Sequence, residues 1–456
     1  MRIHILGICG TFMGSIALLA REQGFAVEGS DAAAWPPMSE ILAQADITVH
    51  SGYSTEHLEP PADCVIIGNA LTRGNPAIEY SLDRGLNFSS GPAWLAENIL
   101  KDRCPIAVAG THGKTTTAAM TTWALDLCGF APGYLIGGAP CFSDRSARLG
   151  SGSPFVVEAD EYDTAFFDKR AKAVHYHPRV LAINNLEYDH ADIYPDLQSI
   201  ATQLHHAVRT VPPSGRVLIN GDDPNLDLIL DQGCWSSLER VGTGANNDWR
   251  ICLGAGQERP VLEYQGEQLG TIELPQPGRH NIRNAAMAVA AASAGGASPP
   301  QALQALSSFP GVKRRLELRG EVAGVAVIDD FAHHPSAIQA SLQALRATDH
   351  QGRIIAVLEP RSRTMQMGIH RANLASSLDQ ADQAFVLAPA DFSWSVAEAL
   401  TPLGKRADCS ASVAELCAKV LALTRPGDRV VIMSNGDFGG IHELLLDGLR
   451  QRQSQS

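Results

Sequence analysis

A short glycine-rich segment with a lysine and hydroxyl groups is the part of the chain best suited to phosphate chemistry. It directly follows the apolar run 106–109 and consists of Gly110, Thr111, His112, Gly113, Lys114, Thr115 and Thr116. Glycines let backbone N–H groups turn toward phosphate oxygens, a lysine adds a mobile cation, and a hydroxyl can bind Mg²⁺. The segment is predicted to be a nucleotide-phosphate loop between a strand and a helix, in a short version that has Val108 where the usual pattern has its first glycine.

Acidic residues follow a second apolar run, 155–157, with four carboxylates in the six positions Glu158-Ala159-Asp160-Glu161-Tyr162-Asp163. Ligands of open α/β sheets gather at the carboxyl ends of strands, and Mg²⁺ prefers hard oxygen ligands. Carboxylates of this segment are therefore the expected Mg²⁺ ligands, the alternative being a solvated acidic loop. A further run, 181–183, leads to His190, which could hold a second metal ion or position a substrate.

Glycines also follow the first apolar run, 3–6, at Gly7, Gly10 and Gly14, and Asp31 ends the next β-rich run. A glycine turn before a helix suits a pyrophosphate, and an acid about twenty residues further on suits a sugar hydroxyl. The spacing is not the usual dinucleotide pattern. It leaves open a nucleotide-sugar site, a nicotinamide-cofactor site and a purely structural turn.

Length, composition and charge bound the kind of protein these segments belong to. A chain of 456 residues with 45% hydrophobic and 19% charged residues predicts a globular protein of about three domains. The formal net charge of −13 argues against nucleic-acid or anionic-membrane partners, so any phosphate site must be local. Nine scattered cysteines, the lack of a signal-peptide pattern and the lack of a long apolar run indicate a reduced, cytoplasmic protein.

The alternation of β-rich runs with helical segments predicts an α/β fold with mostly parallel sheets, and these elements must position the residues above. Breaks near 101–105 and 309–311 divide the chain into predicted domains 1–103, 104–309 and 310–456. The turn-rich stretch 241–277 predicts a small antiparallel appendage. Further strands are predicted at 64–67, 325–328, 354–358, 384–387 and 429–433.

Taken together, these segments resemble the Mur ligases, ATP-dependent enzymes that build the peptide of bacterial cell-wall precursors. The resemblance runs in order through GICGTFMG, GTHGKTTT, VVEADEYD, NNLEYDHADIY, PGRHNIRNAA, GVKRRLE, DDFAHHP and MSNGDFGG. It implies an N-terminal Rossmann-like domain for a UDP-sugar, a central P-loop ATPase, and a C-terminal Rossmann-like domain for an amino substrate. It replaces the nicotinamide interpretation of the first glycines.

The resemblance also implies roles for individual residues. Lys114 and Thr115 would hold ATP phosphates and Mg²⁺, with Glu158 and His190 as the metal-linked acid and histidine. The adenine, triphosphate and ribose contacts fall on Asn281, Asn284, Arg315 and Asp330. The amino substrate contacts fall on His334, Arg361 and Arg363, and the UDP-sugar contacts on Gly7, Gly10, Gly14 and Asp31.

The chain departs from the family pattern in two respects, and the second bears on the amino substrate. Several members carry a carbamylated lysine after the histidine, but 191–209 contains no lysine, as in the alanine-adding branch. The segment 359–365 is shorter than in that branch and lacks its histidine, and 168–177 is extra sequence. Both features resemble the recycling branch, which joins UDP-N-acetylmuramate to L-alanyl-γ-D-glutamyl-meso-diaminopimelate. Lys169, Arg170 and Lys172 could face the carboxylates of this tripeptide or form a solvated basic turn.

The reaction that the resemblance implies has the lactyl carboxylate attack the γ-phosphate, and the amine then open the acyl phosphate to an amide. The main alternative is the UDP-N-acetylmuramate:L-alanine ligase of de novo synthesis. An ATP-binding sensor without catalysis and a P-loop kinase that stops at phosphate transfer are alternatives from other classes, and the kinase would lack an amine-binding domain.

Overall fold

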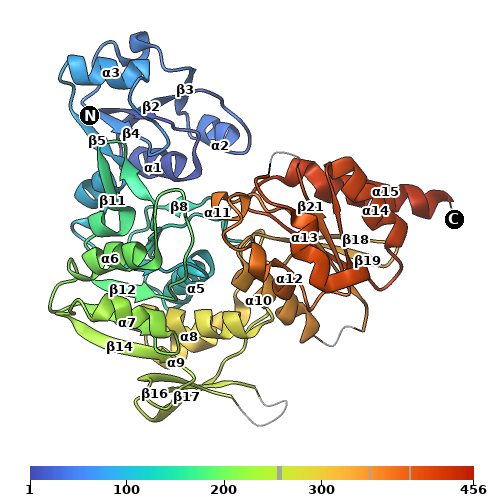
Figure 1. Ribbon diagram of the computed structural model, residues 1–456. Coiled ribbons are helices and arrows are strands. Elements are labelled where there is room, and N and C mark those ends of the chain that lie inside the picture. The colour runs from blue at the N-terminus through green and yellow to red at the C-terminus, as the bar shows by residue number, and fades with distance from the viewer. Residues whose placement is uncertain (254–258, 349–350, 390–391, 456) are drawn as a thin grey trace. The chain divides into compact units, whose positions relative to one another are not determined.

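The computed structural model describes residues 1–253, 259–348, 351–389 and 392–455 (Figure 1). Within these residues the strands form three large sheets of five, ten and six strands and one two-stranded hairpin. The chain divides into two compact units: the first holds residues 1–187, 197–275 and 283–310, and the second holds 188–196, 276–282 and 311–456.

The N-terminal sheet is parallel, in the order β3-β2-β1-β4-β5. Its inner strand β4 is buried at every position, as expected for a short apolar strand covered on both faces. The strands are β1 (Arg2–Leu6), β2 (Ala26–Asp31), β3 (Thr48–Ser51), β4 (Cys64–Ile67) and β5 (Phe88–Ser90). The helices are α1 (Thr11–Glu22), α2 (Met38–Gln44), α3 (Pro76–Asp83) and α4 (Gly91–Leu95).

A buried histidine links the first two strands of this sheet. His4 Nδ1 lies 3.2 Å from Glu28 Oε1, and His4 Nε2 lies 2.9 Å from Ser30 Oγ. Burial lowers the pKa of His4 below its ordinary value of 6.5, although the hydrogen bond and charge of Glu28 oppose the shift. The folded state therefore favours the neutral form of this ring.

Acid is expected to destabilise the fold through His4. The pKa of His4 is lower in the folded state than in the unfolded chain, so the unfolded chain binds more protons below about pH 6.5. The free energy of unfolding therefore decreases as the pH is lowered. We expect Tm to drop between pH 7.5 and 5.5, and to drop less in His4→Gln. The measurement is calorimetry of both proteins across this range; equal pH slopes would assign the loss to other groups.

The central sheet follows the order β17-β16-β15-β14-β13-β12-β6-β9-β7-β8 and is parallel from β15 to β7. Its strands are β6 (Cys104–Ala109), β7 (Gly133–Leu135), β8 (Ala147–Arg148), β9 (Pro154–Glu158), β12 (Val180–Ile183), β13 (Arg216–Asn220), β14 (Ser237–Gly242), β15 (Trp249–Cys252), β16 (Val261–Tyr264) and β17 (Glu267–Thr271). The accompanying helices are α5 (Lys114–Leu127), α6 (Leu197–Val208), α7 (Asp227–Leu230), α8 (Arg279–Ala294) and α9 (Pro299–Ala305).

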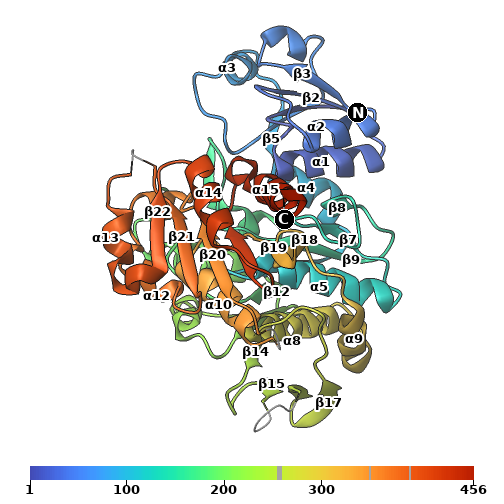
Figure 2. The ribbon, with the colours of Figure 1, turned by 90° about the vertical axis from the view of Figure 1, so that its right-hand side faces the viewer.

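The C-terminal sheet has the order β18-β19-β23-β20-β21-β22, with only its edge strand β18 antiparallel. Side chains of β20 alternate between two cores, one under α10 and α12 and the other under α14 and α15 (Figure 2). The strands are β18 (Glu317–Val322), β19 (Val325–Asp330), β20 (Ile354–Leu358), β21 (Gln383–Leu387), β22 (Ala407–Ser410) and β23 (Arg429–Met433). The helices are α10 (Pro335–Arg346), α11 (Arg363–Gln366), α12 (Leu374–Ser377), α13 (Val396–Leu400), α14 (Val413–Leu423) and α15 (Ile441–Gln455).

The predicted α/β class and mostly parallel sheets are confirmed, and each predicted strand is present with bounds shifted by a few residues at most. The predicted antiparallel appendage is also present as β15, β16 and β17, which extend the edge of the central sheet. Residues 254–258 of that stretch lie outside the described residues. The exact bounds of the three predicted domains stay a prediction.

No helix in the described part of the chain combines the length and apolar character that a membrane crossing needs. No disulfide joins the cysteines in the described part of the chain, and the expected reduced thiols stay a prediction.

Candidate functional site

The predicted phosphate loop lies between the end of β6 and the start of α5. Gly110 and Gly113 have φ angles of +117° and +79°, which favour glycine. Each also has close neighbours: a Cβ at Gly110 would lie 2.9 Å from the backbone N of Asn185, and one at Gly113 would lie 2.5 Å from Asn284 Oδ1. The glycines therefore permit both the turn and the close packing of this loop.

Two asparagines after β12 hold the loop in shape. The His112 N–H donates to Asn185 Oδ1 at 2.7 Å, and Asn185 Nδ2 donates to the His112 carbonyl at 3.1 Å. Asn184 Nδ2 donates to Thr117 Oγ1 at 2.9 Å. The two neighbouring strands β6 and β12 thus deliver the loop and its support to the same edge of the sheet.

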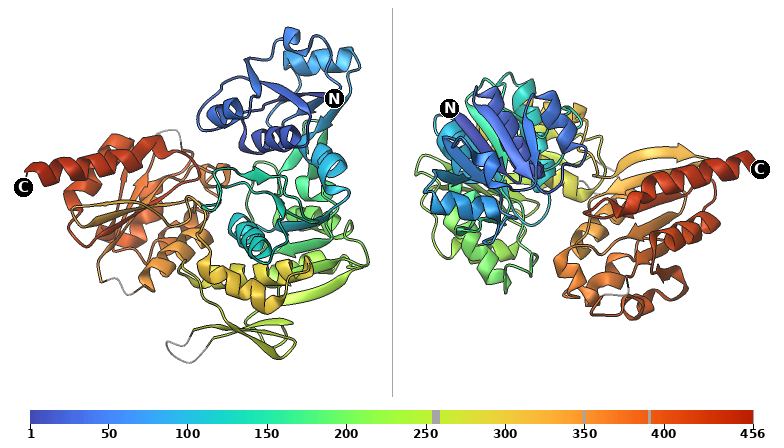
Figure 3. Two further views of the ribbon diagram at one scale, coloured as in Figure 1. Left: turned by 180° about the vertical axis from the view of Figure 1, so that it is seen from behind. Right: turned by 90° about the horizontal axis from the view of Figure 1, so that it is seen from above.

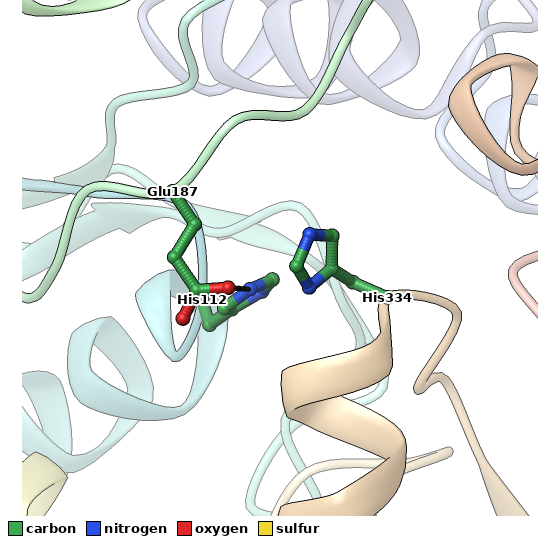
Figure 4. Close-up of side chains that lie close together, drawn as sticks. All are labelled: His112, Glu187 and His334. Atoms are coloured by element: carbon green, nitrogen blue, oxygen red, sulfur yellow. Dashed lines mark ion pairs between the residues drawn. The ribbon is translucent and has the colours of Figure 1, made fainter. Parts of the chain in front are cut away.

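An ion pair extends this support. His112 Nε2 lies 3.5 Å from Glu187 Oε2, as the dashed line in Figure 4 marks. The backbone N–H of Glu187 donates to Thr111 Oγ1 at 2.8 Å, so two consecutive loop residues contact Glu187. The His112 ring is therefore oriented by a carboxylate beside the phosphate loop.

Lys114 begins α5, and its ammonium group is held by several acceptors. Lys114 Nζ donates to Glu161 Oε2 at 2.9 Å and to the carbonyl oxygens of Gly110 and Thr111 at 2.7 and 3.2 Å. Burial by itself lowers the pKa of Lys114, but the carboxylates around it outweigh that effect and place the pKa above its ordinary value. The ammonium therefore stays charged at neutral pH and lies folded back over the loop.

Glu158 ends β9 and joins the loop to a neighbouring segment. Thr115 Oγ1 donates to Glu158 Oε1 at 2.9 Å, and the Gly137 N–H donates to Glu158 Oε2 at 2.7 Å. A hydroxyl and a carboxylate at this distance are both hard oxygen ligands of the kind that Mg²⁺ binds together with phosphate oxygens. These residues of the first unit fit the predicted metal site.

His190 lies beyond the end of the predicted strand 181–183, which the structure contains as β12. β12 ends at Ile183, and His190 lies in the segment 188–196, which belongs to the second compact unit. Its neighbour Asp189 accepts a hydrogen bond from Thr364 Oγ1 at 2.6 Å. Burial would raise the pKa of Asp189, but the hydrogen bond from His333 and the charge of His190 hold it well below its usual range. His190 as a metal ligand stays a prediction.

The first glycine loop is shaped by Asp31. Gly7 has a φ of +80°, and its N–H donates to the Ser30 carbonyl at 2.8 Å. The Cys9 N–H donates to Asp31 Oδ2 at 2.8 Å, so this carboxylate supports the loop itself. A Cβ at Gly14 would lie 2.3 Å from Met38 Sδ, which explains this glycine by helix packing. The UDP-sugar roles of Gly7, Gly10, Gly14 and Asp31 stay predictions.

The residues predicted to contact adenine, ribose and phosphates belong to several elements. Asn281 and Asn284 lie on α8, where Asn281 Nδ2 donates to the Pro277 carbonyl at 2.8 Å. The Arg315 guanidinium lies 4.9 Å from the centre of the Phe331 ring.

Asp330 is buried and bonds to neighbouring backbone groups, and its ribose role stays a prediction. Its carboxylate accepts hydrogen bonds from the N–H groups of Leu316 and Ala332, both at 2.8 Å. Burial raises the pKa of Asp330, with Arg315 the strongest opposing influence. The structure gives this carboxylate a role in holding the start of the C-terminal sheet.

The residues predicted for the amino substrate all lie in the second unit. His334 caps α10, accepting the Ser336 N–H at 3.3 Å, and its ring centre lies 4.3 Å from that of His370. Arg361 Nη1 lies 2.9 Å from Asp437 Oδ1, and the Arg361 side chain is 48% exposed. Arg363 begins α11. Both arginines keep donors that a carboxylate could accept from.

The extra sequence 168–177 begins with β11 (Asp168–Ala171), which pairs with the preceding strand β10 (Asp163–Ala165) in a hairpin, and continues into the 3₁₀ turn η3 (Lys172–His175). Lys169 and Arg170 are exposed and pair with Asp163 and Asp168 within the hairpin. Lys172 is buried. The sequence-based alternative of a solvated basic turn therefore describes the first two cations and is wrong for the third.

Reasoning from the sequence did not assign roles to Glu161 or to the Asn184–Asn185 pair. Their positions after predicted strands could have indicated a role at the site, because residues that follow adjacent parallel strands lie at the same edge of the sheet.

The fold and the site define a phosphate-loop protein of the α/β class with three Rossmann-like or P-loop sheets. Three family models match successive parts of the chain: the "Mur ligase family, catalytic domain" matches residues 2–103, the "Mur ligase middle domain" 108–292, and the "Mur ligase, glutamate ligase domain" 314–436. The chain belongs to the Mur ligase family, which confirms the resemblance seen in its motifs.

Individual relatives are similar over nearly the whole chain. The UDP-N-acetylmuramate--L-alanyl-gamma-D-glutamyl-meso-2,6-diaminoheptandioate ligase of Escherichia coli (strain K12) is 52% identical, covering 99% of each chain. The UDP-N-acetylmuramate--L-alanine ligase of Streptomyces avermitilis is 34% identical, covering 99% of this chain and 98% of the relative. The crystal structure of a murein peptide ligase from Psychrobacter arcticus 273-4 is 42% identical, covers 98% of both chains and has a TM-score of 0.75.

Proposed function

We propose that the protein is an ATP-dependent ligase that joins UDP-N-acetylmuramate to L-alanyl-γ-D-glutamyl-meso-diaminopimelate in peptidoglycan recycling. The observation that carries this proposal is the 52% identity, over 99% of both chains, to the Escherichia coli ligase named for this reaction. The phosphate loop around Lys114 supports the ATP requirement, because its ammonium and glycine geometry suit a triphosphate.

The alternative amino substrate, L-alanine, has weaker support. The alanine ligase of Streptomyces avermitilis is 34% identical to this chain, against 52% for the tripeptide ligase of Escherichia coli. The tripeptide carries several carboxylates and alanine only one, so the pocket of a tripeptide ligase needs more cations. Arg361 and Arg363 are the cations we assign to that pocket.

The residues of the chain would divide the work as follows. Backbone N–H groups of the loop and Lys114 would hold the β- and γ-phosphates, while Thr115 and Glu158 would hold Mg²⁺, with His190 as a further ligand. Bound Mg²⁺ would neutralise phosphate charge. Asn281, Asn284, Arg315 and Asp330 would contact the nucleotide, and Gly7, Gly10, Gly14 and Asp31 the UDP-sugar. His334 would face the amino substrate with the two arginines.

The proposed reaction has two steps that conserve atoms. A lactyl carboxylate oxygen forms a bond to the γ-phosphorus while the bond from that phosphorus to the β,γ-bridging oxygen breaks and ADP leaves. The peptide amine then attacks the acyl carbon, inorganic phosphate leaves with the transferred oxygen, and the amine loses a proton. Positioning and charge neutralisation suffice for this chemistry, which needs no protein nucleophile.

Oxygen labelling tests this route. With both lactyl carboxylate oxygens labelled with ¹⁸O, each amide formed should release one phosphate that carries one ¹⁸O atom. Phosphate without label, formed together with the amide, would exclude the acyl phosphate while leaving ligation in place.

ATP, the two small-molecule substrates and the free cysteines support a cytoplasmic location.

Replacing Glu158 by glutamine is expected to raise the Mg²⁺ concentration needed for the half-maximal ligation rate. The amide keeps the hydrogen-bonding shape beside Thr115 but removes the negative charge that favours a divalent cation. The measurement is the initial rate of ADP release over a Mg²⁺ titration. An unchanged titration would place the metal elsewhere.

A further inference from the structure

Lys172 is a buried lysine that the assigned roles do not use. Its side chain is 6% exposed, and its Nζ donates to Asp160 Oδ2 at 2.9 Å. Lysine is almost never fully buried unless it is paired. An ammonium group has three N–H donors, and Asp160 is the hydrogen-bond acceptor found for Lys172 Nζ among the described residues. Donors therefore remain for a further acceptor.

One neighbour of this ammonium is the first turn of α1. Lys172 Nζ lies 4.6 Å from the centre of the Phe12 ring. The Gly7–Gly10 loop leads directly into α1, which begins at Thr11 with no side-chain cap on its first N–H groups and has Phe12 as its second residue. Lys172 therefore lies beside the loop and helix start that are assigned to the UDP-sugar.

The other neighbour is the acidic segment of the ATP site. Asp160 follows Glu158 by two positions, and its charge contributes to the raised pKa of Lys114. Asp160 Oδ1 is buried and has no hydrogen-bond partner among the described residues. Lys172 thus contacts the helix that follows the first glycine loop, and its partner Asp160 belongs to the acidic segment beside Lys114. The unfilled donors are those of Lys172, because the Asp160 oxygen can only accept a hydrogen bond.

Aromatic packing fixes the position of this lysine. The tip of the β10–β11 hairpin places the Phe167 ring 5.1 Å from that of Phe88 on β5, and Phe166 packs on the N-terminal core that includes Leu6 and Val65. Figure 3 shows the hairpin reaching from the central sheet toward the N-terminal sheet. The hairpin therefore packs on the N-terminal domain through Phe166 and Phe167, and its second strand β11 leads directly into the turn that begins at Lys172.

We propose that Lys172 binds the lactyl carboxylate of the UDP-sugar and holds it for attack on the γ-phosphate. This inference rests on the proposed function. The carboxylate and the γ-phosphate are both anions and must come into contact, so a cation between the two loops would reduce their repulsion. The sequence analysis considered Lys172 as a contact for the tripeptide. In this proposal Lys172 contacts the UDP-sugar instead.

The test compares two UDP-sugars in one variant. Lys172→Met keeps apolar contact with Phe12 and removes the charge. By calorimetry we expect its Kd for UDP-N-acetylmuramate to rise by roughly 10-fold or more, since a charge-assisted hydrogen bond is lost. The Kd for UDP-N-acetylglucosamine, which lacks the lactyl group, and the Kd for ATP should change by less than about 2-fold. Equal weakening for both sugars would overturn the carboxylate assignment.

Matched variants separate this role from a structural one. Lys172→Arg keeps the charge and should recover most of the preference for UDP-N-acetylmuramate. Lys172→Gln can still bond to Asp160 and should lose the preference, which provides a second neutral variant if the methionine variant does not fold. Lys419→Met removes another ion-paired lysine, on α14, and should behave like the wild type. Wild-type protein that binds neither UDP-sugar would refute the proposed function itself.

Discussion

Replacing Lys114 by alanine is expected to lower kcat for ligation by roughly 10²-fold or more, because the variant loses a charge aimed at the transferring phosphate. In the structure this ammonium is bonded to Glu161 and to the carbonyl oxygens of Gly110 and Thr111, so it is already held at the phosphate loop. It remains cationic, since the nearby carboxylates hold its pKa above the ordinary value despite burial.

The measurement is the steady-state rate of ADP and amide formation, with thermal unfolding as a check on folding. Alanine leaves Glu161 without its cation, so some loss of stability is expected together with the loss of rate. Lys419→Ala provides the control, since that lysine pairs with Asp408 and Glu415 on the C-terminal domain. A folded Lys114→Ala protein with near-normal turnover would refute the assignment of the loop.

The second large effect concerns the amino substrate. We expect kcat/KM for the tripeptide to exceed that for L-alanine by roughly 10³-fold or more, since alanine leaves the cations of the pocket without carboxylate partners. Arg361 is half exposed and, among the described residues, pairs with the carboxylate of Asp437, which leaves other donors of the guanidinium for a substrate.

Arg361→Ala should therefore reduce the preference for the tripeptide more than it changes the Kd for ATP. Initial rates with each amine, measured with the wild type and with this variant, decide the question. If L-alanine is the better substrate of the wild type, the recycling assignment is wrong and the alanine ligase alternative is correct.

Local patterns were sufficient to predict the parts of the site that one segment forms by itself. The phosphate loop is such a part, because a buried strand, two glycines with positive φ and a helix start are all encoded between 104 and 127. The residues that support the loop could not be predicted in this way, because Asn185 contacts His112 from the end of a different strand of the sheet. Topology, which the sequence pattern specifies only in outline, decides that contact.

Charged residues show the same limit more clearly. Lys169, Arg170 and Lys172 form one basic cluster in the sequence, and nothing local separates them. In the structure two of them are exposed on the hairpin, while Lys172 is buried against Phe12 from the N-terminal domain. Burial of a charge depends on the partners that the tertiary fold supplies. The sequence of the cluster alone therefore could not predict which of its three cations is buried.

The most direct test of the central claim is product analysis with UDP-N-acetylmuramate, the tripeptide and ATP in one reaction. The account predicts the amide-linked UDP-N-acetylmuramoyl tripeptide, identified by mass spectrometry, with one ADP and one phosphate released for each amide. A phosphorylated UDP-sugar as the stable product, without amide, would identify a kinase. ATP binding with no turnover of either substrate would contradict the assignment of a ligase.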